Sequence, residues 1–177
     1  MSADDTWVSV SMPYVTGEVG DAWAVEAAQH SRKGTHKLLG VAEEPASAEV
    51  AEMLRLKPGE NVTVRRRLVL LDDHPVELAD SYYPSAIAQG TRLADARKIP
   101  GGAVAHLAEL GYPPHRLRED VGSRLADAHE RAALRLPDPA SVLMLFRVLL
   151  TADDQPVEAS IMTMTGSGRR LRYELSF

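Results

Sequence analysis

The sequence predicts an α+β domain, built on a largely antiparallel sheet with helices packed on one side. Two observations carry this prediction. A pattern of strand, helix, strand, hairpin and strand occurs twice, and the second copy lies 80 residues after the first, so that Asp127 matches Ser47. Each copy also reaches a turn sequence, Asp72–Glu77 in the first and Asp153–Glu158 in the second, with one residue inserted in the second copy. Such turns join antiparallel strands without a crossover helix.

The composition is that of one globular domain. The chain has 177 residues, of which 45% are hydrophobic and 25% charged, and it contains no cysteine, which excludes disulfides and catalytic thiols. Its net charge of −5 argues against nucleic acid binding by this chain itself. No apolar segment approaches the ~20 residues that span a bilayer, and the acidic N-terminus does not resemble a secretory signal. We therefore expect a cytoplasmic protein without a membrane partner.

The N-terminal part is expected to differ from the rest. Residues 1–33, punctuated by proline and glycine, predict an irregular lead-in or linker with one short helix over Ala22–Gln29. Asp21 is suited to cap this helix because its carboxylate can accept from free amides of the first turn. The domain proper is expected over residues 34–177, and its first strand over His36–Ala42.

In the first copy of the repeat, Ser47 begins a short helix that ends in the Leu54–Leu56 stretch. A turn at Lys57–Gly59 separates this helix from an apolar segment, Val62–Leu71. The length and composition of that segment predict a strand.

The second copy repeats these signals. Asp127 and Glu130 match a capping box at the start of a helix, and the apolar strand returns as Val142–Leu150. Between the copies, Gly101–Gly111 has apolar residues at helical spacing and ends in a glycine suited to a C-cap. A last strand is expected over Arg170–Phe177.

Arginines interrupt the apolar strands. Arg65 and Arg67 share one face of the first copy's strand, and Arg147, at the position that matches Arg67, interrupts an otherwise aliphatic face. A guanidinium that faces a dry interior needs an anionic partner, either a protein carboxylate or a bound ligand. For Arg147 we favour the structural ion pair. For Arg65 and Arg67 both alternatives stay open, and Arg66, on the other face, is expected to be solvated or to snorkel towards the solvent.

Motifs for catalysis or metal binding are not found in the sequence. The 6 histidines have no metal-ligand spacing and no HExxH pair. No GxSxG elbow is present, and no nucleophile stands at a defined spacing from a base. The sequence therefore predicts no metal, no cofactor and no catalytic residue.

Segments along most of the chain match one known family in order and spacing. They are Glu49–Gly59, Val64–Leu71, Pro75–Pro84, Gly101–Gly102, Glu109–Tyr112, Arg147, Asp154–Glu158 and Leu171–Leu175. Together they resemble the UTRA domain, the ligand-sensing half of HutC-type regulators of the GntR superfamily, which shares its fold with chorismate lyase. The resemblance covers residues 34–177.

The resemblance implies a homodimer and a pocket between sheet and helices for a small, often acidic or phosphorylated metabolite. In relatives, arginines on the strand that matches Val64–Leu71 hold the anionic group, and this role would fall to Arg67. Val69 stands where many relatives have a second arginine, and Ala79 stands where they often have a carboxylate, which argues against a sugar phosphate. With Arg65 and Arg147, the remaining ligand candidates are Ser81, Tyr83, Arg116, Arg118 and Tyr173. A structural role is the alternative for each of them; Tyr173, for example, would fill the core.

The function implied by the resemblance is effector sensing, in which ligand binding modulates DNA binding by a winged helix-turn-helix domain. No winged-helix sequence precedes Trp7, so that domain is expected outside this chain, and both a part of a longer regulator and a stand-alone relative stay open. Two alternatives stay open. One is a chorismate lyase-like enzyme in which Arg67 and Arg147 orient a small carboxylate, and the other is a dimerisation module without a ligand.

Overall fold

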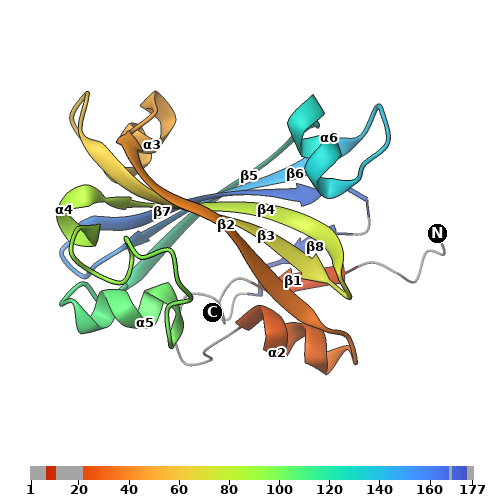
Figure 1. The fold of residues 1–177 in the computed structure, drawn as a ribbon, viewed down its shortest axis with the longest axis horizontal. Helices are drawn as coiled ribbons and strands as arrows, with labels where there is room; N and C mark the ends of the chain where they lie inside the picture. The colour runs from red at the N-terminus through yellow and green to blue at the C-terminus, as the bar shows by residue number, and fades with distance from the viewer. Residues whose placement is uncertain (1–6, 11–21, 168, 175–177) are drawn as a thin grey trace.

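A six-stranded antiparallel sheet forms the centre of the molecule in the computed structural model, which describes residues 7–10, 22–167 and 169–174 (Figure 1). The strand order of this sheet is β2-β3-β4-β7-β6-β5, and β1 and β8 form a separate parallel pair. The strands are β1 (Trp7–Val10), β2 (Gly34–Pro45), β3 (Asn61–Leu71), β4 (His74–Pro84), β5 (Arg116–Leu125), β6 (Ser141–Leu150), β7 (Pro156–Thr165) and β8 (Arg169–Arg172). The helices are α2 (Ala22–Gln29), α3 (Ala48–Leu54), α4 (Ser85–Ala88), α5 (Gly102–Glu109) and α6 (Ala128–Leu134). The predicted α+β class is confirmed.

The internal repeat is visible in the topology. Strands β2, β3 and β4 with α3 form one half, strands β5, β6 and β7 with α6 form the other, and β4 pairs with β7 at the centre. Ser47 caps α3 by accepting from the amide of Val50, whereas Asp127 and Glu130 form the complete capping box of α6. Both helices end at an arginine in the left-handed region, each with φ of 54°. The sequence repeat therefore corresponds to two structurally matched halves of one sheet.

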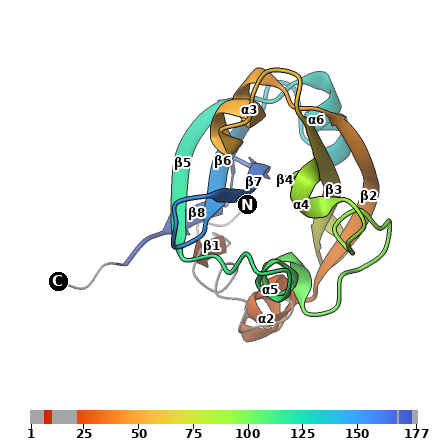
Figure 2. The same ribbon diagram turned by 90° about the vertical axis from the view of Figure 1, so that its left-hand side faces the viewer.

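Helices cover both faces of the sheet, so the expectation that they pack on one side is wrong. Helices α3 and α6 lie over one face, and α2 and α5 lie over the other (Figures 1 and 2). The physical reason lies in β6, where alternating residues enter different clusters: Val148 packs with α3, whereas Leu149 packs with α5. A strand with two apolar faces needs cover on both. We call the side covered by α2 and α5 the α5 face and the opposite side the α3 face.

The lead-in helix packs into the core of the α5 face. Trp23 on α2 is 1% exposed and donates to the carbonyl of Leu70 at 2.8 Å. Gly34 allows this approach, because a Cβ there would lie 2.7 Å from the carbonyl oxygen of Trp23. The helix has the expected bounds, whereas the proposed cap Asp21 lies outside the described residues. The last strand, β8, is shorter than expected and ends at Arg172.

Candidate functional site

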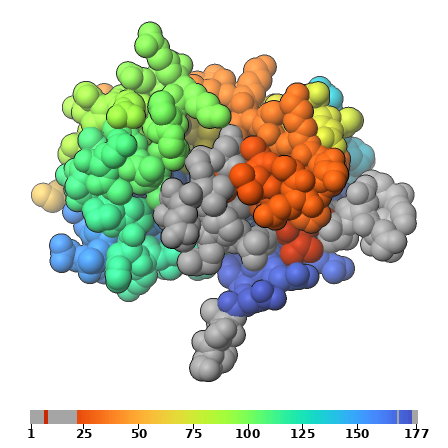
Figure 3. All heavy atoms as spheres, turned by 90° about the horizontal axis from the view of Figure 1, so that it is seen from below, coloured from red at the N-terminus to blue at the C-terminus, as the bar shows by residue number. Residues whose placement is uncertain are grey.

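A row of polar side chains crosses the α5 face of the sheet. The strand registers place Arg65 beside Ser81, Ser81 beside Ser160, Ser160 beside Arg147, and Arg147 beside Glu119. The row therefore runs from β3 to the edge strand β5. Figure 3 shows the molecule from this side, with α2 and the α4–α5 segment covering parts of the face. Polar groups beneath such cover need partners, so each contact in the row is informative.

Four side chains form a directed chain of hydrogen bonds beside this row. Arg67 donates from Nη2 to Ser81 Oγ at 2.8 Å, Ser81 Oγ lies 2.9 Å from Ser160 Oγ, and Ser160 donates to Glu158 Oε1 at 2.8 Å. A hydroxyl carries one proton, and that of Ser160 goes to Glu158. Ser81 must therefore donate to Ser160, and the chain runs from guanidinium to carboxylate.

Both ends of this chain keep an unused polar atom. Nε of Arg67 and Oε2 of Glu158 are buried, and neither has a hydrogen-bond partner among the described residues. A buried polar group without a partner costs about 1–3 kcal/mol. The chain thus offers one donor and one acceptor to a molecule that could satisfy them.

Tyr83 lies next to the carboxylate end of the chain. Its side chain is 1% exposed, and burial together with the neighbouring Glu158 carboxylate raises the pKa of the Tyr83 hydroxyl. The hydroxyl is therefore neutral at physiological pH, and it lies within hydrogen-bonding range of the Glu158 carboxylate.

Arg147 has a protein carboxylate as its partner, as the sequence analysis favoured. Its Nε donates to Glu119 Oε1 at 2.7 Å, and the two side chains are 11% and 5% exposed. Tyr173 donates from its hydroxyl to the other oxygen, Glu119 Oε2, at 2.8 Å. Tyr173 is 53% exposed, so the structural alternative of a core position is excluded, although its hydroxyl does have a partner.

Arg65 holds a loop. Its guanidinium donates, over distances of 2.6–3.4 Å, to four carbonyl oxygens between β4 and α5, those of Arg92, Leu93, Asp95 and Arg97. Burial lowers the pKa of the Arg65 guanidinium, and these carbonyls compensate part of its lost hydration. Arg65 therefore fixes the segment that follows α4 rather than presenting free donors.

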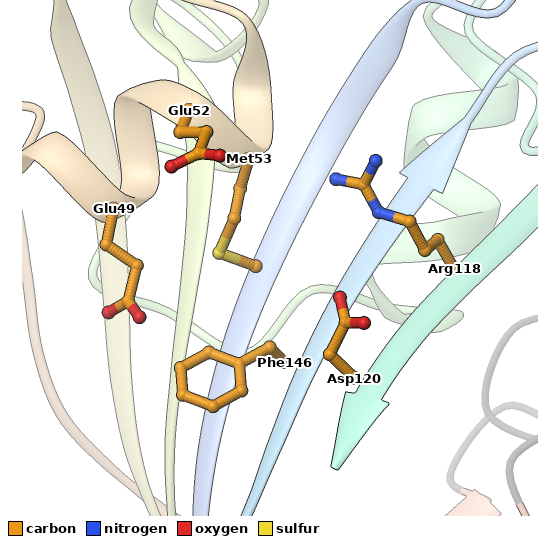
Figure 4. Close-up of a pocket in the computed structure, with 6 residues that line it drawn as sticks. All are labelled: Glu49, Glu52, Met53, Arg118, Asp120 and Phe146. Carbon is orange, nitrogen blue, oxygen red and sulfur yellow. The ribbon is translucent and has the colours of Figure 1, made fainter. Parts of the chain in front are cut away.

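Arg116 and Arg118 are on β5 but do not join the hydrogen-bond chain. Arg116 is exposed and forms an ion pair with Asp154. Arg118 points to the α3 face, where it borders a groove of about 440 Å³ between α3 and β5 (Figure 4). Its lining residues are Glu49, Glu52, Met53, Arg118, Asp120 and Phe146. Arg66, expected to be solvated or snorkelling, lies on the same face with a side chain 38% exposed and pairs with Glu44 at 2.7 Å.

The structure thus brings together Arg67, Ser81 and Tyr83 among the predicted site residues, with Arg147 close by in the same row. It adds Ser160 and Glu158, which the sequence analysis did not propose. A signal for Glu158 was present, since it matches Glu77 in the repeat, but its partner could not be identified without the register.

The described part of the chain holds no cluster of three or more residues suited to a metal ion. Among the same residues, no helix is long and apolar enough to cross a membrane.

Comparison with known proteins gives the fold and site a context. The family model of the UTRA domain matches residues 29–168. An HTH-type transcriptional regulator of Streptomyces coelicolor is 33% identical over 132 residues, which cover 73% of this chain and 49% of that protein. This chain therefore spans about half the length of that relative.

Solved structures share the fold. The effector domain of PhnF from Mycobacterium smegmatis superposes with a TM-score of 0.75 at 19% identity, covering 88% of this chain and 94% of that one. The C-terminal domain of the histidine utilization repressor from Pseudomonas syringae pv. tomato gives a TM-score of 0.70 at 24% identity, covering 82% of this chain and 100% of that one. The fold is the chorismate lyase-like fold.

These findings define the class first: the chain is a ligand-binding effector domain of the kind found in transcription regulators, and its relatives are regulators rather than enzymes. More specifically, the chain belongs to the UTRA domain family. The resemblance seen in the sequence is confirmed.

Proposed function

We propose that this chain senses a small anionic metabolite for a HutC-type regulator, and that the metabolite binds at Arg67. The observation that carries this proposal is the state of the Arg67 side chain. It is a partly buried cation whose described hydrogen-bond partner is the neutral Ser81 and whose Nε is unsatisfied. Among the described residues, no carboxylate lies within ion-pair distance of it. A planar anion that accepts from Nε would gain a charge-assisted hydrogen bond.

The surrounding residues support the same site. Ser81 and Ser160 connect Arg67 to Glu158, whose unsatisfied oxygen suits a donor group on the ligand, and Tyr83 adds a neutral hydroxyl. Arg65 shapes the site by holding the loop after α4. The remaining candidates, Arg116, Arg118, Arg147 and Tyr173, have structural contacts or lie on other surfaces, and we propose no direct ligand contact for them.

In the whole regulator, effector binding would shift the equilibrium of a DNA-binding winged helix-turn-helix domain outside this chain. Such coupling is typically worth about 1–3 kcal/mol between the two sites. The proposal includes a homodimer, a cytoplasmic location and a division of this chain into a lead-in, residues 1–33, and a sensing domain, residues 34–177.

A thermal-shift screen with a panel of anionic metabolites tests the proposal. A saturating ligand raises the stability of the wild-type chain by RT ln(1 + [L]/Kd). Arg67→Ala should remove the response to the best ligand, because the guanidinium that binds the anion is gone. Arg116→Ala is the matched control, since Arg116 is exposed on β5, and it should respond as the wild type does. A full response from a folded Arg67→Ala variant would contradict the assignment.

A further inference from the structure

The edge strand β5 has an open side. It pairs with β6 through ten consecutive residues, from Arg116 to Leu125, without a register shift, and no described strand pairs with its other edge. Figure 2 shows β5 along one margin of the molecule. Val121 and Leu125 on this strand are 51% and 68% exposed. A long, regular edge with exposed apolar side chains is a template for another strand.

The opposite edge of the sheet, β2, is protected. Its pairing with β3 is interrupted by a register shift between Leu38 and Gly40, and the strand ends at Pro45. Bulges and prolines are features that prevent strand addition at sheet edges. The β2 edge is therefore protected against strand addition, whereas the β5 edge has no such feature.

Two charged residues at the centre of β5 have no partner among the described residues. Arg118 and Asp120 lie on the α3 face beside the groove of Figure 4, and neither forms a hydrogen bond or ion pair with another described residue. The other two arginines of β5 are paired, Arg116 with Asp154 and Arg124 with Glu130. The two unpaired groups are of opposite charge and are two residues apart.

A second copy of β5 can be added antiparallel to the first, related to it by a two-fold axis normal to the sheet. In such a pair, residues that lie directly opposite each other have side chains on the same face of the sheet. The two-fold axis must therefore lie at a residue, which then faces its own copy in the partner subunit, and not between two residues. An axis at Glu119 places Arg118 opposite Asp120 of the partner subunit, and it does so twice by symmetry. The same register places Leu117 opposite Val121 of the partner subunit, also twice.

Neighbouring registers are worse. An axis at Arg118 or at Asp120 opposes two like charges that no other described residue neutralises, and an axis at Val121 opposes Arg118 to Arg124, which destabilises a cross-strand pair. An axis at Gly122 opposes Asp120 to Arg124, but Arg124 already binds Glu130 at 2.6 Å. In the register centred on Glu119, Arg118 and Asp120, which have no partner among the described residues, pair with each other across the interface.

This register also puts the two Glu119 carboxylates opposite each other on the α5 face. Each is compensated by its own Arg147 at 2.7 Å and by a hydrogen bond from Tyr173. Arg147 is in the polar row that begins beside Arg67, at Arg65.

We propose that two copies of this chain associate through antiparallel pairing of β5, in the register centred on Glu119, to form one continuous twelve-stranded sheet. This inference rests on the proposed homodimer and assigns its interface. Reciprocal Arg118–Asp120 ion pairs fix the register, and the Leu117–Val121 contacts cover the exposed valine.

Sedimentation equilibrium of wild-type chain and charge-reversal variants tests the proposal. Arg118→Asp and Asp120→Arg each convert two attractive pairs into two repulsive ones, so each should raise the dimer Kd by about tenfold or more. An equimolar mixture of the two variants restores complementary charges in a heterodimer, which should form with near wild-type affinity. The double variant Arg118→Asp with Asp120→Arg should likewise recover the homodimer.

Lys37→Asp is the matched control, a charge reversal on the exposed part of the other edge strand, and it should leave the dimer unchanged. A wild-type dimer that neither single variant weakens would overturn the β5 interface while leaving the homodimer in place. A wild-type chain that stays monomeric would overturn both. Weakening without recovery in the mixture would overturn the register.

Discussion

The two halves of the repeat carry matching arginines with different surroundings. Arg67 on β3 and Arg147 on β6 occupy equivalent positions, and each lies beside a residue of its own outer strand. For Arg147 that residue is Glu119, which forms an ion pair with it at 2.7 Å, whereas for Arg67 it is Leu38. The fold thus provides two equivalent inward cations and neutralises one of them. The other, Arg67, donates to the neutral Ser81 and keeps an Nε without a partner among the described residues.

For the matching glutamates, it is the residue of the first half that has an ion-pair partner. Glu77 on β4 pairs with Arg169 at 3.2 Å, and burial raises its pKa, an effect that the Arg169 charge opposes. Glu158, its equivalent on β7, binds Ser160 and keeps one unsatisfied oxygen. Each half therefore contributes one unsatisfied charged group, and the Ser81–Ser160 contact joins them.

The largest expected effect is a difference in the free energy of unfolding between the alanine variants of the two arginines. Arg147→Ala leaves the buried Glu119 carboxylate without its ion-pair partner, so the free energy of unfolding should fall by about 3–5 kcal/mol. Arg67→Ala removes one hydrogen bond to a serine and should cost about 1 kcal/mol. Urea denaturation at neutral pH measures both. In the control, Arg147→Met combined with Glu119→Leu removes both charges and should recover most of the loss. Equal losses from the two alanine variants would contradict the comparison.

The next largest effect is expected from a substitution that gives the first half of the repeat the ion pair found in the second half. Leu38→Glu gives Arg67 a carboxylate in the place that Glu119 occupies beside Arg147, so the anionic effector must compete with a built-in partner. Ligand affinity, measured by calorimetry, should fall by about tenfold or more without loss of folding. Leu39→Glu, at a neighbouring position that is 50% exposed, is the control and should bind normally. Unchanged binding by the Leu38 variant would show that Arg67 is not the anchor.

The smallest effect concerns the helices of the two halves. Glu130 in the α6 capping box has its pKa lowered, mainly by the hydrogen bond from Arg124, from an ordinary value of 4.5. This pair therefore stabilises the fold above the ordinary pKa, and its contribution is lost as pH falls through the lowered folded-state pKa. Arg124→Ala should cost about 0.5–1 kcal/mol at pH 7 and almost nothing in strong acid.

Ser47→Ala, which removes the uncharged cap of α3, is the reference for this effect. Its cost should be nearly independent of pH, because the hydroxyl does not titrate. Urea denaturation across the acidic range compares the two variants, and a parallel pH dependence would contradict the assignment to Glu130.

Much of the fold could be predicted because local patterns determine it. The turn sequences, the caps at Ser47 and Asp127 and the apolar strands gave both halves of the repeat. An ion pair for Arg147 could also be anticipated from its position on an aliphatic face. The identity of its partner could not, because Glu119 is chosen by the pairing of β5 with β6.

The functions of the other arginines depended on contacts that leave no side-chain signature in the sequence. Arg65 binds backbone carbonyls of a loop, and any residue type can supply those. Arg118 shares a strand with Arg116 but lies on the α3 face, away from Arg67. Helical cover on both faces could not be predicted, because polar residues within the strands hide the apolar character of each face.

The central claim, that Arg67 and not Arg147 receives the effector, can be tested directly by nuclear magnetic resonance of the arginine Nε–H groups. The ligand is the anion that gives the largest thermal shift, and Arg67→Lys and Arg147→Lys assign the two signals by their disappearance. We expect the Arg67 Nε–H signal to move on titration, because this atom gains an acceptor, while the Arg147 signal keeps the position set by Glu119. A stationary Arg67 signal together with a shifted Arg147 signal would contradict the account.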